Sequence, residues 1–294
     1  AQPAENWTGA ERGSRKARRR DPRSRAARYF LAELLFRTGR IGDGLEEIAS
    51  LSRLVPTAGG RISQLLARYA RTPGAASQLD DLFRRQPAMR PAILGELAKD
   101  AVNADLVLAL ADGGQSDGDQ AWKGLLVQGL VESGQYEKAR RTWSRLSGVT
   151  STGPVFDADF RGSAAPPPFN WTFASGGSGF AEPENGTLHA IYYGRDPVVL
   201  AAQLLTLRSG PHRLAMHVTG GSGVAESLAW RISCVPSQAV IGELHLEVAR
   251  LASEVTIPAD CAAQRMELAG TPRDVPSQVD VRITDLRLTP MQPR

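Results

Sequence analysis

Residues 136–168, YEKARRTWSRLSGVTSTGPVFDADFRGSAAPPP, contain the point at which the chain changes its residue pattern. Upstream, apolar residues recur at helical spacing between short glycine-containing breaks. Downstream, they alternate in short runs separated by Gly, Pro and Asp, which is typical of strands. The sequence therefore predicts two domains, a helical one over 1–150 and a β-rich one over 151–294. The last helical face in this stretch consists of Tyr136, Ala139, Trp143 and Leu146.

Helical hairpins account for the first domain. Apolar faces lie before and after Gly39, and Pro56 is expected to end the second helix. The same arrangement recurs around Gly134, which lies 95 positions after Gly39, or three periods of about 32 residues. More degenerate hairpins fall between them, with breaks expected at Gly74 and near Asn103. Because one hairpin buries too little apolar surface alone, we expect the hairpins to stack on one another.

The first and last hairpins share a set of large, small, turn and aromatic positions. The first has Leu31, Ala32, Gly39, Ile48 and Pro56, and the last has Leu126, Gly134, Tyr136, Ala139 and Trp143. This set resembles the tetratricopeptide repeat, and the resemblance covers about 24–147. It implies a right-handed α-hairpin solenoid whose concave groove binds a protein partner. Tyr136 and Trp143 could line that groove, but their spacing favours a place in the core.

About nine short strands are predicted in the second domain. Leu188, Ala190 and Tyr192 alternate with His189, Ile191 and Tyr193, and a later run alternates Leu214, Met216 and Val218 with Arg213, Ala215 and His217. Many short strands with no helix of similar weight indicate an antiparallel β-sandwich, most simply a jelly roll. The fold class is therefore multidomain, α followed by β.

Four pieces of this domain have a characteristic order. They are Phe169-Asn-Trp171, the run from Leu200 to Leu207, the turn and strand from Ser209 to Leu214, and Leu286-x-Leu288. In this order they resemble the galactose-binding-like jelly rolls of many carbohydrate-binding modules, over about 155–290. The resemblance implies sugar binding, although some such domains only support their neighbours.

Sugar recognition needs exposed aromatic faces together with groups that hydrogen-bond hydroxyls. Trp171, Tyr192 and Tyr193 are the candidate aromatic platforms, and Arg195, in the turn after Tyr193, is the candidate hydroxyl ligand. Alternation sends Tyr192 and Tyr193 to opposite faces of their strand, so one is expected to be buried. For Trp171, packing in the core or between the domains is favoured over a ligand role.

The two cysteines, Cys234 and Cys261, are 27 positions apart and both lie in the β-rich domain. They are too few for a zinc site and are not spaced as a redox motif. Either they form a disulfide, which indicates an oxidising compartment, or they are small buried apolar residues. Their places at strand edges beside prolines favour the disulfide.

Charge is uneven along the chain. Nine basic side chains lie between Arg12 and Arg28, but no aromatic residue lies among them to stack on bases, so we expect a solvated helix face and no nucleic-acid partner. No apolar run is long enough to span a bilayer. The four histidines include His189 and His217, both in mid-strand, where they could be neighbours, yet no acid with ligand spacing accompanies them. We expect no metal, no cofactor and no catalytic residue.

These features predict a non-catalytic binding or scaffold protein of the bacterial cell envelope. Only four of the 35 basic residues are lysine, which indicates a high-GC bacterial coding bias. We expect a periplasmic or secreted protein whose signal peptide has already been removed before Ala1. The helices would dock a protein partner and the sandwich would bind polysaccharide, in surface polysaccharide assembly or export. One alternative is a structural adaptor whose sandwich binds only protein, and a second is an accessory part of a carbohydrate-active enzyme.

Overall fold

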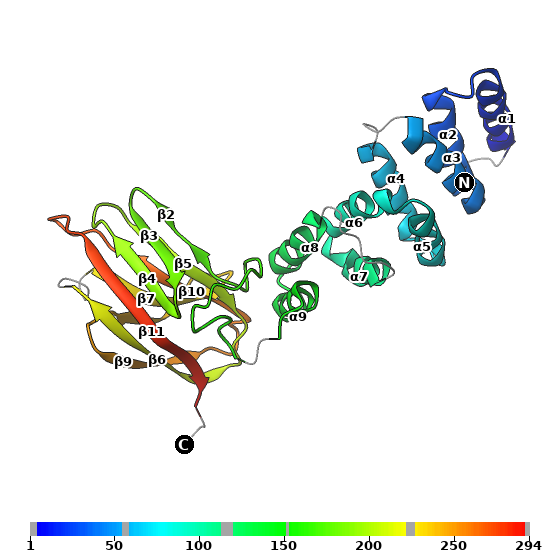
Figure 1. Cartoon of the computed structure of the whole chain (residues 1–294). Coiled ribbons are helices and arrows are strands. Elements are labelled where there is room, and N and C mark those ends of the chain that lie inside the picture. The colour runs from blue at the N-terminus through cyan, green and yellow to red at the C-terminus, as the bar shows by residue number, and fades with distance from the viewer. Residues whose placement is uncertain (1–4, 55–58, 113–119, 151–152, 222–226, 292–294) are drawn as a thin grey trace. The chain divides into compact units, whose positions relative to one another are not determined.

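The computed structural model describes residues 5–54, 59–112, 120–150, 153–221 and 227–291. In these residues helices are followed by two antiparallel sheets that form a β-sandwich (Figure 1), so the predicted α-then-β fold class is confirmed. The chain divides into two compact units, Ala1–Gly129 and Leu130–Arg294. The last helix belongs to the second unit. Residues 151–152, at the expected domain boundary, lie outside the described residues.

The helices pair through tight turns that use glycine. Gly39 has φ +74°, and the amide of Arg40 donates to the carbonyl of Leu35 at 2.8 Å. Gly134 also has φ +74°, and the amide of Gln135 donates to the carbonyl of Leu130 at 2.9 Å. Both predicted breaks are thus confirmed. Glycine occupies these two turns because it adopts the left-handed conformation without a steric cost. The helices are α1 (Glu5–Arg20), α2 (Arg25–Arg37), α3 (Ile41–Leu54), α4 (Gly59–Ala70), α5 (Ala75–Arg85), α6 (Arg90–Ala98), α7 (Ala104–Asp112), α8 (Ala121–Glu132) and α9 (Tyr136–Ser147).

The predicted apolar faces form the core of the first unit. The breaks expected at Gly74 and Asn103 separate α4 from α5 and α6 from α7. Asn103 is buried, and its side-chain amide donates to the carbonyl of Leu97 at 3.0 Å, which satisfies a carbonyl near the end of α6. Pro56, the expected end of the second helix, lies outside the described residues. The buried residues of the core include Leu31, Leu35, Ile48, Leu66, Leu79, Leu82, Phe83, Ile93, Leu94 and Val107.

The sandwich has the strand order of a jelly roll. One sheet has the order β1-β5-β10-β7-β8 and the other β2-β3-β4-β11-β6-β9, with every pairing antiparallel. From β4 onward, consecutive strands lie in opposite sheets except for β7 and β8, which pair within one sheet, and this is the double Greek-key order. The strands are β1 (Thr172–Phe173), β2 (Ser175–Gly176), β3 (Gly179–Glu184), β4 (Thr187–Tyr192), β5 (Val198–Leu205), β6 (Gly210–Gly220), β7 (Leu228–Val235), β8 (Val240–His245), β9 (Arg250–Ile257), β10 (Ala263–Gly270) and β11 (Val279–Pro290).

Period-two alternation fills the space between the two sheets. Trp230 is fully buried and packs on Trp171 at a ring-centroid distance of 5.7 Å. Buried Gln203 on β5 exchanges two hydrogen bonds of 2.9 Å with the backbone amide and carbonyl of Phe156. This pairing satisfies all four polar groups and fastens the segment before the first strand to the five-stranded sheet.

Helix α9 packs against that same segment. Trp143 is buried, donates its indole N–H to the carbonyl of Pro166 at 2.6 Å and contacts Phe156 edge-on at 5.0 Å between ring centroids. Arg140 lies over the rings of Trp143 and Phe169, and burial lowers its pKa while the charge of Glu137 acts in the opposite direction. The prediction that Trp143 is a core residue is confirmed, and its partners belong to the start of the β-rich half.

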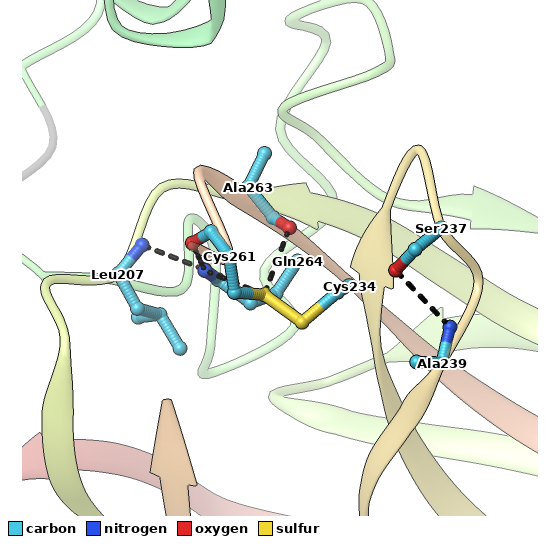
Figure 2. Close-up of a disulfide and its surroundings, with 7 residues drawn as sticks. All are labelled: Leu207, Cys234, Ser237, Ala239, Cys261, Ala263 and Gln264. Atoms are coloured by element: carbon cyan, nitrogen blue, oxygen red, sulfur yellow. Dashed lines mark hydrogen bonds between the residues drawn. A yellow bond between two sulfur atoms is a disulfide. The ribbon is translucent and has the colours of Figure 1, made fainter. Parts of the chain in front are cut away.

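The disulfide predicted between Cys234 and Cys261 is present (Figure 2). It joins the end of β7 to the residues before β10, with 5.4 Å between the two Cα atoms. Beside it, the buried side chain of Gln264 accepts from the amide of Leu207 at 2.8 Å and donates to the carbonyl of Cys261 at 2.9 Å (Figure 2). The disulfide and Gln264 together hold three loops at this end of the sandwich.

Candidate functional site

The outer face of the six-stranded sheet carries a shallow groove over β6, β9 and β11. The groove has a volume of about 320 Å³. On β6 the residues Leu214, Met216 and Val218 point into the sandwich, so Arg213, Ala215 and His217 point outward. The groove is lined by Arg213, Ala215, Met216, His217, Arg250, Leu251, Ala252, Asp285 and Arg287.

The strand register explains why the surface is hollowed here. Ala215 on β6 lies opposite Ala252 on β9 and opposite Arg287 on β11. Two alanines therefore occupy the centre of the groove. The cross-strand rows of residues on either side of them carry larger side chains, for example His217 opposite Arg250. Neighbouring strands lie about 4.8 Å apart and successive outward residues about 6.7 Å apart, so long side chains surround a low apolar floor.

A bulge in β11 shapes one side of this groove. The register shifts between Thr284 and Arg287, and Asp285 at the bulge has φ +53°. A bulge turns side chains away from their regular alternation, and here both Asp285 and Arg287 are exposed at the groove. The groove thus combines three guanidinium groups with one carboxylate and one imidazole.

A polar cluster lies next to the groove on the same sheet. His189 on β4 places Nε2 3.0 Å from Oδ1 of Asp280 and Nδ1 3.7 Å from Oε2 of Glu184. Arg282 lies within 3.9 Å of Glu184 and within 3.7 Å of Asp280. The charges in this cluster therefore have partners within the protein.

His189 and His217 are not on neighbouring strands, because β11 lies between β4 and β6. Among the described residues, no group of three or more His, Cys, Asp or Glu is placed to hold a metal ion.

Two of the residues proposed from the sequence as sugar ligands are buried. Trp171 is 5% exposed; it packs between Phe160 and Trp230 and donates its indole N–H to the carbonyl of Asp157 at 3.2 Å. Tyr192 is fully buried and donates its hydroxyl to the carbonyl of Asp196 at 3.0 Å. Their rings face other side chains, because both residues lie on inward positions of the sandwich.

The other two residues proposed from the sequence lie at the turn after β4. Tyr193 is half-buried, because it follows the buried Tyr192 and so lies on the opposite face of the strand. Arg195 is exposed. Burial raises the pKa of the Tyr192 hydroxyl, and the negative charge of Asp196 raises it further. Neither Tyr193 nor Arg195 lines the groove on β6, β9 and β11. A ligand role for these two residues stays a prediction.

Sequence reasoning missed the groove for two reasons. Arg213, Ala215 and His217 were placed on one strand face, but the pairing of β6 with β9 and β11 cannot be read from local alternation. Arg250 and Ala252 lie in a part of β9 that its residue pattern did not predict as strand. The only available signal was the alternation of small and basic residues, Arg213-x-Ala215 and Arg250-x-Ala252, in two separate segments.

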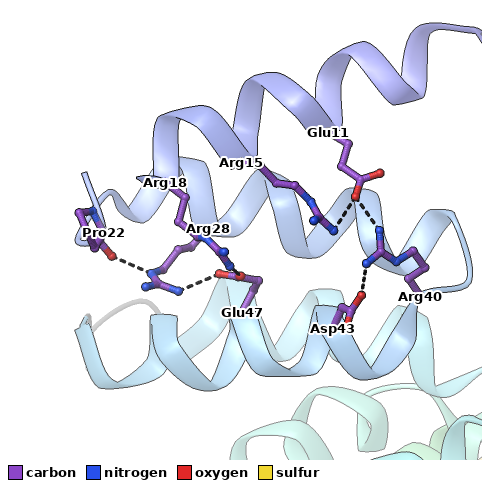
Figure 3. Close-up of polar contacts among 8 residues, drawn as sticks. All are labelled: Glu11, Arg15, Arg18, Pro22, Arg28, Arg40, Asp43 and Glu47. Carbon is purple, nitrogen blue, oxygen red and sulfur yellow. Dashed lines mark hydrogen bonds and ion pairs between the residues drawn. The ribbon is translucent and has the colours of Figure 1, made fainter. Parts of the chain in front are cut away.

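The basic N-terminal segment is tied into the helical unit by ion pairs (Figure 3). Buried Glu47 on α3 accepts from Arg28 on α2 at 2.8 Å and also pairs with Arg18 on α1. Glu11 on α1 accepts from Arg15 at 2.8 Å and from Arg40 at 2.6 Å. Figure 3 shows these side chains bridging three helices, so part of the positive charge of this segment is used within the unit.

No protein-family model matches the sequence, and no curated protein matches it significantly. Among solved structures, a CBM4 carbohydrate-binding module is similar over 47% of this chain and 99% of its own length, with 11% identity and a TM-score of 0.37. TmCBM61, solved in complex with β-1,4-galactotriose, is similar over 48% of this chain and 100% of its own, with 14% identity and a TM-score of 0.33. A structure of the accessory secretory proteins 1, 2 and 3 of Streptococcus pneumoniae is similar over 49% of this chain and 99% of its own length, with 7% identity and a TM-score of 0.29. All three TM-scores lie below 0.5, and the jelly-roll assignment rests on this chain's own strand order.

Among the described residues, no helix is both long and apolar enough to cross a bilayer.

Proposed function

We propose that this chain is a non-catalytic binding and scaffold protein of the bacterial cell envelope. In this proposal the sandwich binds polysaccharide in the groove on β6, β9 and β11, and the helical repeats dock a protein partner. The observation that carries the proposal is the groove itself, in which hydrogen-bonding side chains surround a floor of two opposed alanines.

The groove suits an extended chain of sugars for two physical reasons. Its floor of Ala215 and Ala252 offers apolar contact to the C–H face of a pyranose ring and leaves room for the ring to approach the sheet. Its sides offer donors on arginine and an acceptor on Asp285, which together can pair with hydroxyl groups. No Phe, Tyr or Trp side chain among the described residues lines it, so we expect hydrogen bonds rather than ring stacking to provide most of the affinity.

A binding role also accounts for how the acidic residues are placed. Glu182 and Glu184 both lie on β3 and are exposed at alternate positions, so both project from the same side of one strand. Glycoside hydrolysis needs two carboxyl groups on opposite sides of the scissile bond. This placement favours a binding module over a glycosidase, and we propose no catalytic step.

The location proposed for the protein rests on the disulfide. A disulfide such as Cys234–Cys261 persists in oxidising compartments, which in bacteria means the periplasm or the outside of the cell. The proposed partner of the helical unit is a peptide or helix held in the groove of a tetratricopeptide-like solenoid. The matching turns at Gly39 and Gly134 support this repeat assignment, because the same backbone geometry recurs at the predicted spacing.

The test blocks the groove sterically. Ala252→Trp places a bulky ring on the exposed floor of the groove, and Thr256→Trp places the same ring on the same strand and face, four positions away. The full chain and both variants are titrated against a panel of neutral and acidic bacterial polysaccharides. We expect at least one polysaccharide to bind the wild type and Thr256→Trp equally, and Ala252→Trp at least tenfold more weakly.

Two results would contradict the proposal. Binding that Ala252→Trp leaves intact would place the sugar site elsewhere on the protein. A folded protein that binds no polysaccharide in the panel, yet retains a protein partner from the same cell envelope, would favour the adaptor whose sandwich binds only protein. Circular dichroism of each variant checks that the sandwich is folded.

A further inference from the structure

We infer that the polysaccharide held in this groove is acidic, and that Arg213, Arg250 and Arg287 bind its carboxylate, sulfate or phosphate groups. The inference rests on the proposed polysaccharide-binding function and names the class of ligand. It follows from where the three guanidinium groups lie and from the charges that surround them.

The three arginines surround the groove floor formed by Ala215 and Ala252. Arg287 is on the same cross-strand row as Ala215 and Ala252, so its side chain begins beside the floor. Arg250 lies one row to one side of this floor and Arg213 one row to the other. With about 6.7 Å between rows, the Cα atoms of Arg213 and Arg250 are on the order of 14 Å apart. An arginine side chain can span half of that distance, so the three guanidinium groups can reach charged groups on successive sugars of one polysaccharide chain.

These arginines differ from Arg231 and Arg282 of the same sandwich, which have acidic partners. Within the described residues, no hydrogen bond or ion pair involves the guanidinium group of Arg213, Arg250 or Arg287. By contrast, Arg231 pairs with Glu243 at 2.8 Å on the other sheet, and Arg282 lies between two carboxylates in the cluster around His189. In the part of the chain that the structure describes, the three groove arginines are therefore without an ion-pair partner, whereas the charges of Arg231 and Arg282 are matched.

The acidic side chains near the groove do not cancel this charge. Asp285 is the only carboxylate among the groove-lining residues, so the lining has an excess of two positive charges when His217 is neutral. Glu254 lies opposite Arg213 in the register, but no ion pair joins them in the structure. Three guanidinium groups close together repel one another, and an anionic ligand removes that repulsion on binding.

Guanidinium also has the geometry that this role requires. Its planar fork of donors pairs with two oxygens of a carboxylate, sulfate or phosphate, whereas a sugar hydroxyl offers one oxygen and no charge. A groove for a neutral sugar needs acceptors as well as donors, because each hydroxyl both donates and accepts. Three donor-only cations beside one carboxylate and one imidazole therefore favour an anionic ligand.

The experiment compares polymers that share one backbone. Unmodified dextran, carboxymethyl dextran, dextran sulfate and dextran phosphate are titrated against the full chain by calorimetry, and polygalacturonate is compared with its methyl ester. We expect each acidic polymer that binds to do so at least tenfold more tightly than its neutral counterpart. Its affinity should fall as salt is raised from 50 to 300 mM, because added ions screen the contacts. The polymer that binds best identifies the charged group.

Matched variants test the three arginines. Arg213→Ala, Arg250→Ala and Arg287→Ala should each weaken acidic-polymer binding by about fivefold to tenfold. Arg287→Lys should restore part of the affinity, since it keeps the charge and loses the fork. Arg208→Ala removes an exposed arginine of the same domain outside the groove and should change nothing.

Three outcomes would overturn the inference. Equal affinity for neutral and charged polymers, with no effect of the arginine variants, would leave polysaccharide binding in place and refute the acidic ligand. Acidic-polymer binding that survives in the arginine variants but is lost when Arg19 and Arg20 on α1 are changed to Ala would assign it to the N-terminal basic segment. Absence of binding to every polymer, neutral or acidic, would refute the proposed function together with the inference.

Discussion

Removal of the Cys234–Cys261 disulfide is expected to lower the free energy of unfolding of the sandwich by about 3.5 kcal/mol. The bond closes a loop with a sequence separation of 27 residues. In the chain-entropy model, closing a loop of that size removes about 12 cal/mol/K from the entropy of the unfolded chain, which is about 3.5 kcal/mol at 25 °C. The folded contacts around Gln264 do not depend on the bond and should remain.

Urea denaturation of the full chain measures this effect. The Cys234→Ala/Cys261→Ala variant is compared with the wild type with and without reductant, and unfolding is followed by near-ultraviolet circular dichroism. With an m-value of about 2 kcal/mol/M, the urea midpoint of the sandwich transition should fall by about 1.7 M. Reductant should lower the midpoint of the wild type by a similar amount and leave the variant unchanged.

An unchanged midpoint in the double variant would refute the reasoning, because it would mean that the loop is already constrained in the unfolded state or that the bond does not form. Mass spectrometry after alkylation, without reductant, separates these two explanations. Two alkylated cysteines in native oxidised protein would also remove the support for an oxidising compartment.

Three further substitutions test other parts of the fold. Gln203→Leu should destabilise the sandwich by about 2–4 kcal/mol in urea denaturation, because it leaves the amide and carbonyl of Phe156 buried without partners; a loss below 0.5 kcal/mol would show that these groups reach water. Gly194→Ala should cost at least about 2 kcal/mol, since Gly194 has φ +72° and a Cβ there would lie 2.6 Å from the carbonyl oxygen of Ser277; normal stability would mean that this turn rearranges. Glu47→Gln should destabilise the helical unit by about 1–3 kcal/mol through loss of charge between its two arginine partners, and thermal unfolding with no shift would indicate that this network is too solvated to matter.

Much of the fold was predictable because its signals are local. Helical periodicity and the glycines at 39 and 134 predicted the hairpin turns, since a left-handed turn needs glycine whatever surrounds it. Alternation predicted which residues of β4 and of β6 share a face, and the structure shows which of the two faces points inward. The cysteine pairing followed from two cysteines at strand edges in one domain. Each inference used only residues that are close in the chain or are the only members of their type.

The candidate site was not predictable in this way, because strand pairing joins segments that are distant in sequence. Trp171 and Tyr192 were proposed as ligands for their chemistry, and the packing of the two sheets buries both. Arg213 and Arg250 looked like ordinary exposed charges until the register of β6 with β9 placed Ala215 opposite Ala252.

The amino-acid sequence by itself thus determined the order of the two architectures and the turns at Gly39 and Gly134, divided the residues of the main strands between two faces, and favoured the disulfide. Tertiary structure alone decided that three arginines from β6, β9 and β11 surround one apolar floor. The physical reason is that period-two alternation assigns each side chain to a face, whereas neighbours on that face depend on register, which is set by the packing of the whole sandwich.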